Sequence, residues 1–293
     1  MDKMMKDKKI IALFVLPGLA VFTVVFVIPI LFTLIYSLTD WNGINDMNFV
    51  GLNNYIRMFT DDPIFIIGVR NNFIFLALSL LGQIPAALCL ALLISRFTAG
   101  IKFFKTAFFI PVLLSTSAIA LLWQRVYEPN FGIVNQVAEL IGSSWSQEWL
   151  SSGNTVVQAL AIPIIWQFIG YHLVILYAGI KSIPEQYYEA ALIDGADGIK
   201  ATFYITIPLL QDIIKVCIVL CAVGSLKLFD LIYIMTKGGP HNSSITIALQ
   251  MYNEAFLKMS YGYGSAIAIF LVIACLAIAF IINKSLETQD MQF

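Results

Sequence analysis

Charged residues are scarce in this sequence. Asp, Glu, Lys and Arg together make up 12% of the 293 residues, whereas 59% are hydrophobic. Soluble domains usually carry about 25% charged residues and about 45–50% apolar residues. This composition excludes an ordinary soluble domain and indicates a protein whose solvent is a bilayer. The net charge of -1 also argues against nucleic acid as a partner, because nucleic-acid-binding domains show a basic excess or a basic face.

Cysteine and histidine are also few. Cys217 and Cys221 are four apart and share a predicted helix face, a spacing that could suit a metal pair. The chain's two histidines, His172 and His241, lie far from them in sequence. All four cysteines fall inside apolar runs rather than in loops, where a disulfide framework would lie. We therefore expect the cysteines to pack as small hydrophobes, and we predict no metal site.

Six apolar segments are long enough to cross a membrane, which takes about 20 residues. Continuous apolar runs favour helices, because the strands of a barrel would alternate over about ten residues. The first run follows a basic N-terminus, as in a signal peptide, but it is much longer than the roughly 7–15-residue apolar core of one. We therefore predict an all-α membrane protein in which the first helix is retained. The six predicted transmembrane helices are 10–38, 71–95, 106–127, 155–180, 210–236 and 261–283.

The distribution of Lys and Arg predicts the orientation. If the N-terminus is cytoplasmic, that side holds eleven of these residues and the opposite side holds five. Cytoplasmic loops carry the excess of positive charge, so both termini are predicted to be cytoplasmic. We divide the chain into residues 1–69 (N-terminus, first helix and first outer loop), 70–284 (a five-helix core) and 285–293 (a cytoplasmic tail). Interfacial anchoring and partner docking remain open for the outer loops.

The predicted cytoplasmic loop 181–209 is long for a connector. Pro184 can start a helix, and Glu185 suits its N-terminal dipole. Gly195 can end that helix, and Pro208 marks the turn into the fifth span. We expect two short helices joined by a glycine turn. Such a pair could enter a groove on another protein or rest on lipid as an interfacial helix; the residues alone leave both open.

One pattern in this loop resembles a known family. Glu189-Ala190-Ala191, Gly195 and Ile205-Thr206-Ile207-Pro208 have the spacing of the EAA motif of ABC importer permeases, although the family favours Leu at position 207. Flanking residues look like the carbohydrate-transporting branch, similar to the larger permease subunit of maltose-type importers. Further resembling segments cover most of the chain: Gly51-Leu52-Asn53-Asn54-Tyr55, Pro111, Phe131-Gly132-Ile133-Val134-Asn135, Lys227-Leu228-Phe229-Asp230, Thr236-Lys237-Gly238-Gly239-Pro240 and Tyr261-Gly262-Tyr263-Gly264-Ser265-Ala266.

The resemblance implies a type I ABC importer permease in a prokaryotic inner membrane. Its partners would be a second EAA-type permease, an ATPase dimer docked on the loop, and an extracytoplasmic sugar-binding protein. ATP and Mg would be bound by the ATPase, and no cofactor by this chain, which has no GxxxxGK[ST] phosphate loop. The residues implied to couple to the ATPase are Glu189, Ala190, Ala191, Asp194, Gly195, Ile205 and Pro208.

Polar residues inside the predicted spans are candidates for a sugar site, because they are costly in lipid. Gln167 and Tyr171 are four apart and share a helix face. Lys227 and Asp230 are three apart and could partly neutralise one another, either as a structural ion pair or at a cavity. The family resemblance implies that Tyr171, Gly224, Ser225 and Leu228 line the substrate path.

Two other functions remain possible from composition. A secondary transporter would need intramembrane carboxylates for coupling, and Asp230 is the one good candidate. A membrane-embedded enzyme would need a cluster of His, Asp or Cys, which the sequence does not suggest. The EAA-like loop favours the ABC permease over both, because only that function gives the loop a task.

Overall fold

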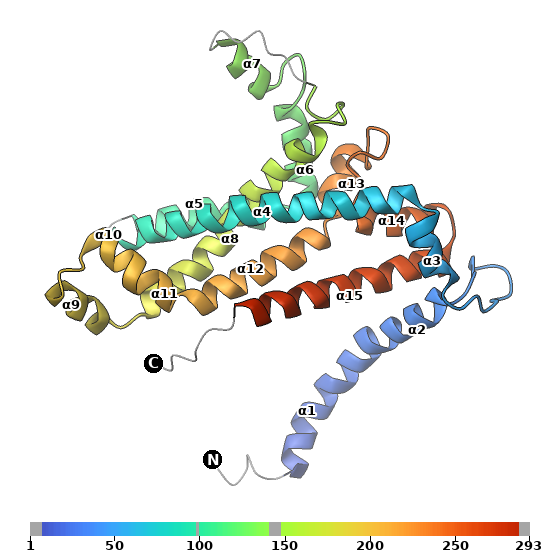
Figure 1. Ribbon diagram of the computed structural model, residues 1–293, viewed down its shortest axis with the longest axis horizontal. Helices are drawn as coiled ribbons and strands as arrows, with labels where there is room; N and C mark the ends of the chain where they lie inside the picture. Colours follow the sequence, from blue (N-terminus) through green and yellow to red (C-terminus); the bar gives the residue numbers. More distant parts are fainter. Residues whose placement is uncertain (1–7, 98–99, 141–147, 287–293) are drawn as a thin grey trace. The chain divides into compact units, whose positions relative to one another are not determined.

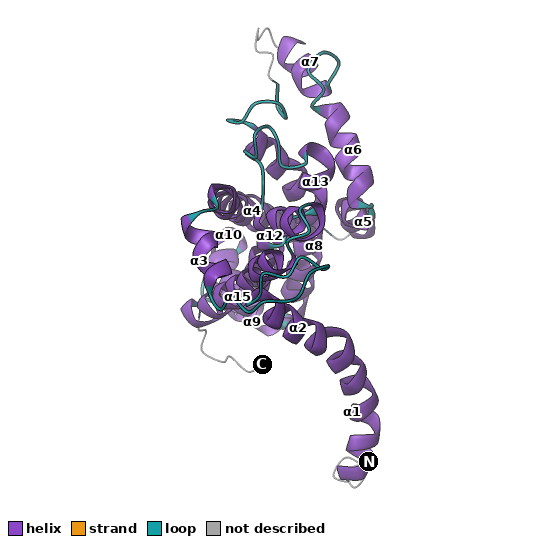
Figure 2. Cartoon of the chain, turned by 90° about the vertical axis from the view of Figure 1, so that its right-hand side faces the viewer, coloured by secondary structure: helices purple, strands orange, loops and turns teal. Residues whose placement is uncertain are grey.

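A computed structural model of the chain describes residues 8–97, 100–140 and 148–286. Within these ranges the regular structure is helical, apart from one isolated antiparallel bridge between Thr39 and Phe49 (Figure 2). The all-α prediction is thus confirmed. The elements are α1 (Lys8–Phe22), η2 (Thr23–Val27, π-helical), α2 (Ile28–Ser37), α3 (Asn53–Thr60), α4 (Pro63–Ser95), α5 (Ile101–Leu113), α6 (Thr116–Val126), α7 (Ile133–Leu140), α8 (Val156–Ser182), α9 (Glu185–Ile193), α10 (Gly198–Ala201), η3 (Thr202–Thr206, π-helical), α11 (Ile207–Leu209), α12 (Gln211–Leu226), α13 (Asp230–Thr236), α14 (Ile247–Tyr252), η4 (Asn253–Leu257, π-helical) and α15 (Tyr261–Ser285).

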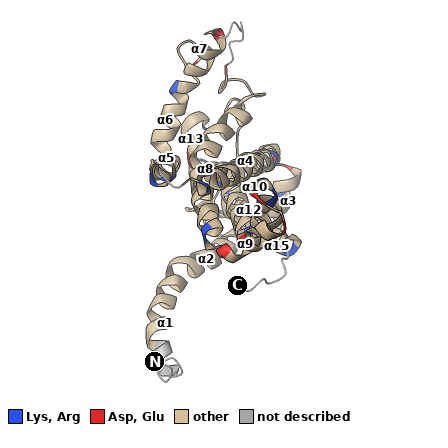
Figure 3. Ribbon diagram, turned by 90° about the vertical axis from the view of Figure 1, so that its left-hand side faces the viewer, with Lys and Arg blue, Asp and Glu red and all other residues tan. Residues whose placement is uncertain are grey.

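Four helices of the described chain are long and apolar enough to cross a membrane. They are Leu13–Ser37, Pro63–Ser95, Val156–Ser182 and Tyr261–Ser285, and they match the first, second, fourth and sixth predicted spans. Two further spans are present if each of two bent helix pairs counts as one, Ile101–Leu113 with Thr116–Val126 and Gly198–Leu209 with Gln211–Leu226. Most of the ribbon carries neither acidic nor basic residues, as a bilayer requires (Figure 3).

The third span is bent by 96° between α5 and α6, a feature that the continuous apolar run did not predict. Pro111 lies buried in the last turn of α5, and Leu114 then adopts an extended backbone with ψ 146°. Ser115 restarts the chain as the N-cap of α6, where its hydroxyl accepts a hydrogen bond from the amide of Ala118 at 3.2 Å. Local proline and capping chemistry therefore accounts for this bend.

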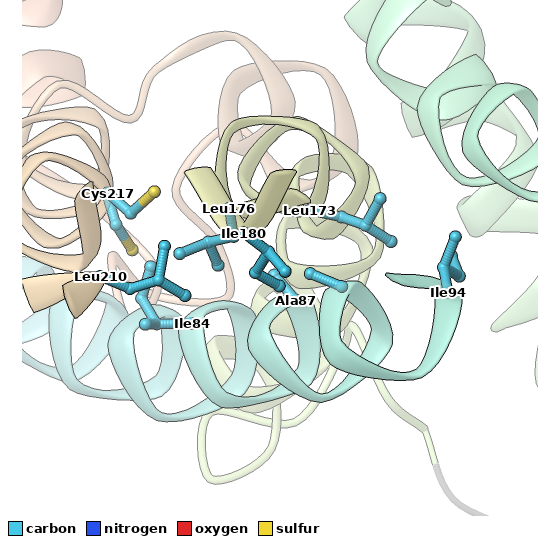
Figure 4. Close-up of a cluster of buried hydrophobic side chains, with 10 residues drawn as sticks. Ile84, Ala87, Ile94, Leu173, Leu176, Ile180, Leu210 and Cys217 are labelled. Carbon is cyan, nitrogen blue, oxygen red and sulfur yellow. The ribbon is translucent and has the colours of Figure 1, made fainter. Parts of the chain in front are cut away.

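The hydrophobic core of the larger part of the chain lies where α4, α8 and α12 pack along one another (Figure 1). Ile84 and Ala87 of α4 and Leu173 and Leu176 of α8 belong to one cluster of buried hydrophobic side chains (Figure 4). Cys217 and Cys221 belong to the same cluster and are buried. Cys217 packs as a small hydrophobe, as expected, whereas Cys221 also donates a hydrogen bond to the side-chain oxygen of Gln83 at 3.5 Å.

Contacts divide the chain into two compact units. One contains the described residues up to Asp62 together with residues 251–270, and the other contains residues 63–250 and those beyond 270. The predicted division has its first boundary at 69 and does not group residues 251–270 with the N-terminal part. Residues 1–7 and 287–293, which include most of the predicted tail, lie outside the described residues.

The smaller unit is held by buried polar side chains. The amide of Asn54 donates to the carbonyls of Ser37 and Thr39 at 2.9 and 2.7 Å. The hydroxyl of Tyr263 donates to a carboxylate oxygen of Asp62 at 2.7 Å, and these two residues are 201 positions apart in sequence. The bonds of Asn54 join α3 to the end of α2, and the bond of Tyr263 joins Asp62 to the start of α15.

Candidate functional site

A cavity of about 390 Å³ lies between α8, α12 and the start of α13, with a contribution from α4. Every residue that the sequence analysis proposed for a substrate site lines this one cavity. They are Gln167 and Tyr171 from α8, Gly224 and Ser225 from α12, and Lys227, Leu228 and Asp230 at the junction with α13. The structure therefore brings the seven residues together, while their binding of a substrate stays a prediction.

The walls of the cavity differ in their hydrogen-bonding capacity. Ser225 donates its hydroxyl hydrogen to the carbonyl of Cys221 at 2.8 Å, so its remaining capacity is as an acceptor. Gln167 is buried and Tyr171 is half-buried, each with a polar end. At Gly224 a Cβ atom would meet nothing within 4 Å. The cavity thus combines donors, acceptors and an aromatic face with open space beside α12, which suits a polyhydroxylated ligand.

Lys227 and Asp230 do not form the helical pair that their spacing predicted. α12 ends at Leu226 and α13 begins at Asp230, with Phe229 between them at φ -138° and ψ -64°. Both residues are described and exposed, and no ion pair joins them. A helix break lies between the two residues, so the expectation that they share one helix face is wrong.

The break between α12 and α13 is held by Asn72 of α4. Its side-chain amide donates to the carbonyls of Ser225 at 2.9 Å and Leu226 at 3.0 Å. Its side-chain oxygen accepts from the amide of Ile247 at 2.9 Å. The last carbonyls of a helix have no partner within it, and in lipid each unsatisfied group costs several kcal/mol. Asn72 therefore makes a break possible at this point in the membrane.

A second polar side chain supports the same break. The hydroxyl of Thr246 donates to the carbonyl of Leu228 at 2.8 Å. Gln124 of α6 satisfies the other end of α13, donating to the carbonyls of Ile234 and Met235 at 3.2 and 3.0 Å. The cavity residues of α12 and α13 are thus positioned by side chains from three other parts of the chain.

The loop 181–209 has the predicted two-helix form. α9 ends at Ile193, and Gly195 follows with a left-handed φ of 73°. The amide of Gly195 bonds to the carbonyl of Leu192 at 3.1 Å and that of Ala196 to the carbonyl of Ala191 at 2.8 Å. These two bonds form a Schellman motif. Ala191 and Gly195 are therefore spaced as the Schellman motif at the end of a helix requires.

The second half of the loop consists of α10, η3 and α11, and it meets α12 at an angle of 67° next to Pro208. The hydroxyl groups of Tyr188 and Thr206 lie 3.1 Å apart and join the two halves. Glu189 is exposed, and no hydrogen bond or ion pair joins it to another described residue.

Around the turn, large apolar side chains are also exposed: Leu192, Ile193, Ile199, Phe203 and Tyr204. Ala190 and Asp194 are exposed, and Ile205 and Pro208 are half-buried.

The sequence was compared with models of known protein families. The family described as "Binding-protein-dependent transport system inner membrane component" matches residues 6–289. The chain belongs to this family.

Relatives along the whole chain agree. The permease is 36% identical to a probable ABC transporter permease protein of Pyrococcus horikoshii, over 93% of this chain and 94% of the relative. It is 32% identical to the diacetylchitobiose uptake system permease of Streptomyces coelicolor, over 91% and 80% of the two chains. It is 31% identical to the trehalose/maltose transport system permease of Thermococcus litoralis, over 95% and 94%. The chain is therefore a membrane-spanning transport subunit and not an enzyme.

Solved structures share the permease fold. A chain of a bacterial ABC transporter involved in the import of the acidic polysaccharide alginate superimposes with a TM-score of 0.82, over 97% of each chain, at 23% identity. A chain from the crystal structure of a bacterial alginate ABC transporter in complex with an alginate pentasaccharide-bound periplasmic protein gives a TM-score of 0.83, over 96% of this chain and 95% of that one, at 23% identity. The fold prediction is confirmed by these matches.

Several residues of the permease site escaped sequence reasoning. Gln83 of α4, Thr116 of α6 and His172 of α8 also line the cavity. Nothing in the described chain bonds to the Nδ1 atom of the buried His172. No group of three potential metal ligands occurs in the described part of the chain. The signal for Asn72 was available, because an Asn-Asn pair inside an apolar run is costly unless both amides find partners.

Proposed function

We propose that this permease forms one half of the translocation path of an ATP-driven sugar importer. Sugar would pass through the cavity between α8, α12 and α13, after delivery by an extracytoplasmic binding protein. A second permease would supply the other half of the path. ATP would be hydrolysed by a separate ATPase dimer docked on the loop 181–209.

The observation that carries the proposal is the cavity itself. Gln167 and Tyr171 on α8 face Gly224 and Ser225 on α12 across a space of about 390 Å³. Side-chain amides and hydroxyls can bond sugar hydroxyls, and the tyrosine ring offers a face to the C–H surface of a sugar ring. Lys227 and Asp230 also line this space and form no ion pair with each other, and each can bond a sugar hydroxyl. Relatives whose names specify diacetylchitobiose and trehalose/maltose support an oligosaccharide as the substrate class.

The surface of the loop 181–209 supports an ATPase as its occupant. Glu189 offers an uncommitted carboxylate, and Ile193 and Tyr204 are 87% and 77% exposed beside the glycine turn. Burial in a cleft of another subunit would remove this apolar surface from water, at about 25 cal/mol per Å². Lys181 and Lys200 belong to the loop, and Arg96 donates a hydrogen bond to it; this basic cluster supports a cytoplasmic position. Both termini would then be cytoplasmic in a prokaryotic inner membrane.

Reconstitution tests this function. The permease is co-expressed with a second permease and an ATPase from its own organism, and the complex is placed in proteoliposomes with the binding protein outside. Labelled oligosaccharides should enter only when ATP and Mg are supplied on the loop side. Uptake that follows a proton or sodium gradient without ATP would instead establish a secondary transporter, and the proposal would be abandoned.

A further inference from the structure

Arg96 is the first residue after α4, and its side chain reaches the loop 181–209. Its Nη2 atom donates to the carbonyl of Gly198 at 3.4 Å and to the hydroxyl of Thr202 at 3.0 Å. The hydroxyl of Thr202 in turn donates to the carbonyl of Gly198 at 3.0 Å. One guanidinium therefore holds the start of α10 from a position 102 residues earlier in the chain. Hydrogen bonds from a charged donor are about twice as strong as neutral ones.

The contact of Arg96 with the loop crosses a space that side chains do not fill. A cavity of about 570 Å³ separates α10 and η3 from the ends of α4 and α8, and Arg96, Lys181 and Thr202 line it. Where side chains do not fill the space between two elements, packing cannot transmit a displacement. The polar contacts of Arg96 bridge this space. A second polar contact, from the ammonium of Lys181 to the carbonyl of Ser95 at 3.3 Å, joins the ends of α4 and α8.

The other end of this connection is the proposed sugar cavity. α4 is one helix from Pro63 to Ser95, and Gln83 on that helix lines the cavity. The two positions are about 20 Å apart, at 1.5 Å per residue. A helix transmits displacement along its axis through its backbone hydrogen bonds, and α4 stays one helix from Pro63 to Ser95 although Pro85 has no amide hydrogen to donate. α4 is thus a direct link between the loop and the cavity, separate from the covalent links through α8 and α12.

We propose that Arg96 is a positioning residue that couples the loop 181–209 to α4, and through α4 to the sugar cavity. This inference rests on the proposed function, since only a loop displaced by an ATPase has motion to transmit. Arg96 does not line the sugar cavity, and its hydrogen bonds go to Gly198 and Thr202 rather than to Glu189 or the apolar side chains of α9. Its loss should therefore uncouple ATP hydrolysis from transport while leaving sugar recognition and ATPase docking in place.

The reconstituted complex provides the test. In Arg96→Ala we expect the number of ATP molecules hydrolysed per sugar carried to rise about tenfold, on the order expected for loss of a hydrogen bond from a charged donor. Arg96→Lys, which keeps the charge but not the planar fork, should lie between Ala and the native residue. Thr202→Val should raise the ATP-to-sugar ratio less than Arg96→Ala does, and the double variant should show little more than Arg96→Ala alone. Thr202→Ser keeps the hydroxyl and should behave as the native protein. Lys102→Ala is the matched control, because Lys102 is an exposed cation on the next helix.

Two outcomes would overturn the proposal. One is an unchanged ATP-to-sugar ratio in Arg96→Ala, and the other is a parallel fall in uptake, ATPase activity and assembled complex, which indicates a merely structural role. Hydrogen exchange of amides 194–206 gives a readout that needs no substrate. Exchange of these amides should accelerate in Arg96→Ala and not in Lys102→Ala. Equal exchange rates in Arg96→Ala and the native protein would show that Arg96 does not hold the loop. If the native complex carries no sugar, the proposed function fails, and the exchange measurement still decides whether Arg96 holds the loop.

Discussion

Gly224 faces the cavity, and nothing in its surroundings requires a glycine. A Cβ atom there meets no atom within 4 Å, and the position is helical, where Ala is more stable than Gly by about 1 kcal/mol. We predict that Gly224→Ala folds and transports as the native protein does. Gly224→Trp should fold equally well but fill the cavity, and so reduce sugar uptake at least tenfold.

The control for this prediction is Gly18→Trp. Gly18 also lies in a membrane-spanning helix with nothing within 4 Å of a Cβ atom, but it does not line the cavity. Membrane levels of both tryptophan variants are compared by immunoblot and uptake by labelled sugar. Normal uptake by Gly224→Trp would show that substrate does not pass beside α12.

Tyr171 is a second test at the scale of one residue. Its ring and hydroxyl line the cavity, so Tyr171→Phe removes only the hydroxyl, and Tyr171→Ala removes both. A lost neutral hydrogen bond costs about 0.5–1.5 kcal/mol, so Phe should weaken transport roughly two- to tenfold. Ala should weaken transport by an order of magnitude or more. Binding of the ATPase subunit should be unchanged in both, and a change there would argue against a cavity-specific role.

Among the elements, the turn after α9 has the clearest backbone requirement. Gly195 has a φ of 73° and open space around it, so conformation rather than crowding restricts this position. Gly195→Val should cost about 1–3 kcal/mol of local strain, distort the Schellman motif and abolish transport. Gly195→Asn should be tolerated, because Asn adopts the left-handed region most readily among non-glycine residues. Retained coupling in the valine variant, measured as ATP hydrolysed per sugar, would contradict this assignment.

The break between α12 and α13 has its own prediction. Asn72→Leu removes three hydrogen bonds and leaves two buried carbonyls and one amide without partners. Each unsatisfied buried group costs about 1–3 kcal/mol, so the midpoint of thermal unfolding in detergent should fall clearly. Asn45→Leu, at an exposed loop position, is the control and should leave that midpoint unchanged. An unaltered midpoint in Asn72→Leu would mean that the break does not depend on α4.

These two elements also show what the sequence could predict. The two helices of the loop 181–209 follow from local signals, Pro184 before α9 and Gly195 after it, and the structure has both. The break after Leu226 has no such signal, because its cause is an asparagine 153 residues away. For the same reason the charges of Lys227 and Asp230 were predicted on one helix. Gln167, Lys227 and Asp230 were identified as polar residues in apolar spans, and the family resemblance implied Tyr171, Gly224, Ser225 and Leu228. Gln83 is also a polar residue in a predicted span, but only the packing of α4 beside α8 and α12 shows that it lines the same cavity.

For the whole molecule, division of labour between chains is the main expectation. The permease purified alone should hydrolyse no ATP, since its sequence has no phosphate-binding loop of the GxxxxGK[ST] type. Affinity purification of the tagged permease from its own membranes should recover an ATPase and a second permease in stoichiometric amounts. Glu189→Lys should lower recovery of the ATPase but not of the second permease. ATP hydrolysis by the isolated chain would refute this arrangement.

The contacts of Asn72 have a consequence for how the chain is made. Ribosomes add about 5–20 residues per second, and Asn72 precedes Ser225 by 153 residues. The asparagine is therefore synthesised roughly 8–30 s before the carbonyl that it will bind. Span five emerges as an apolar segment that can insert as continuous helix, with every backbone group satisfied internally. It can then open at residues 227–229 by docking against a helix that is already in the bilayer. Synthesis from the N-terminus thus places Asn72 in the membrane before the segment 227–229 that it will hold open.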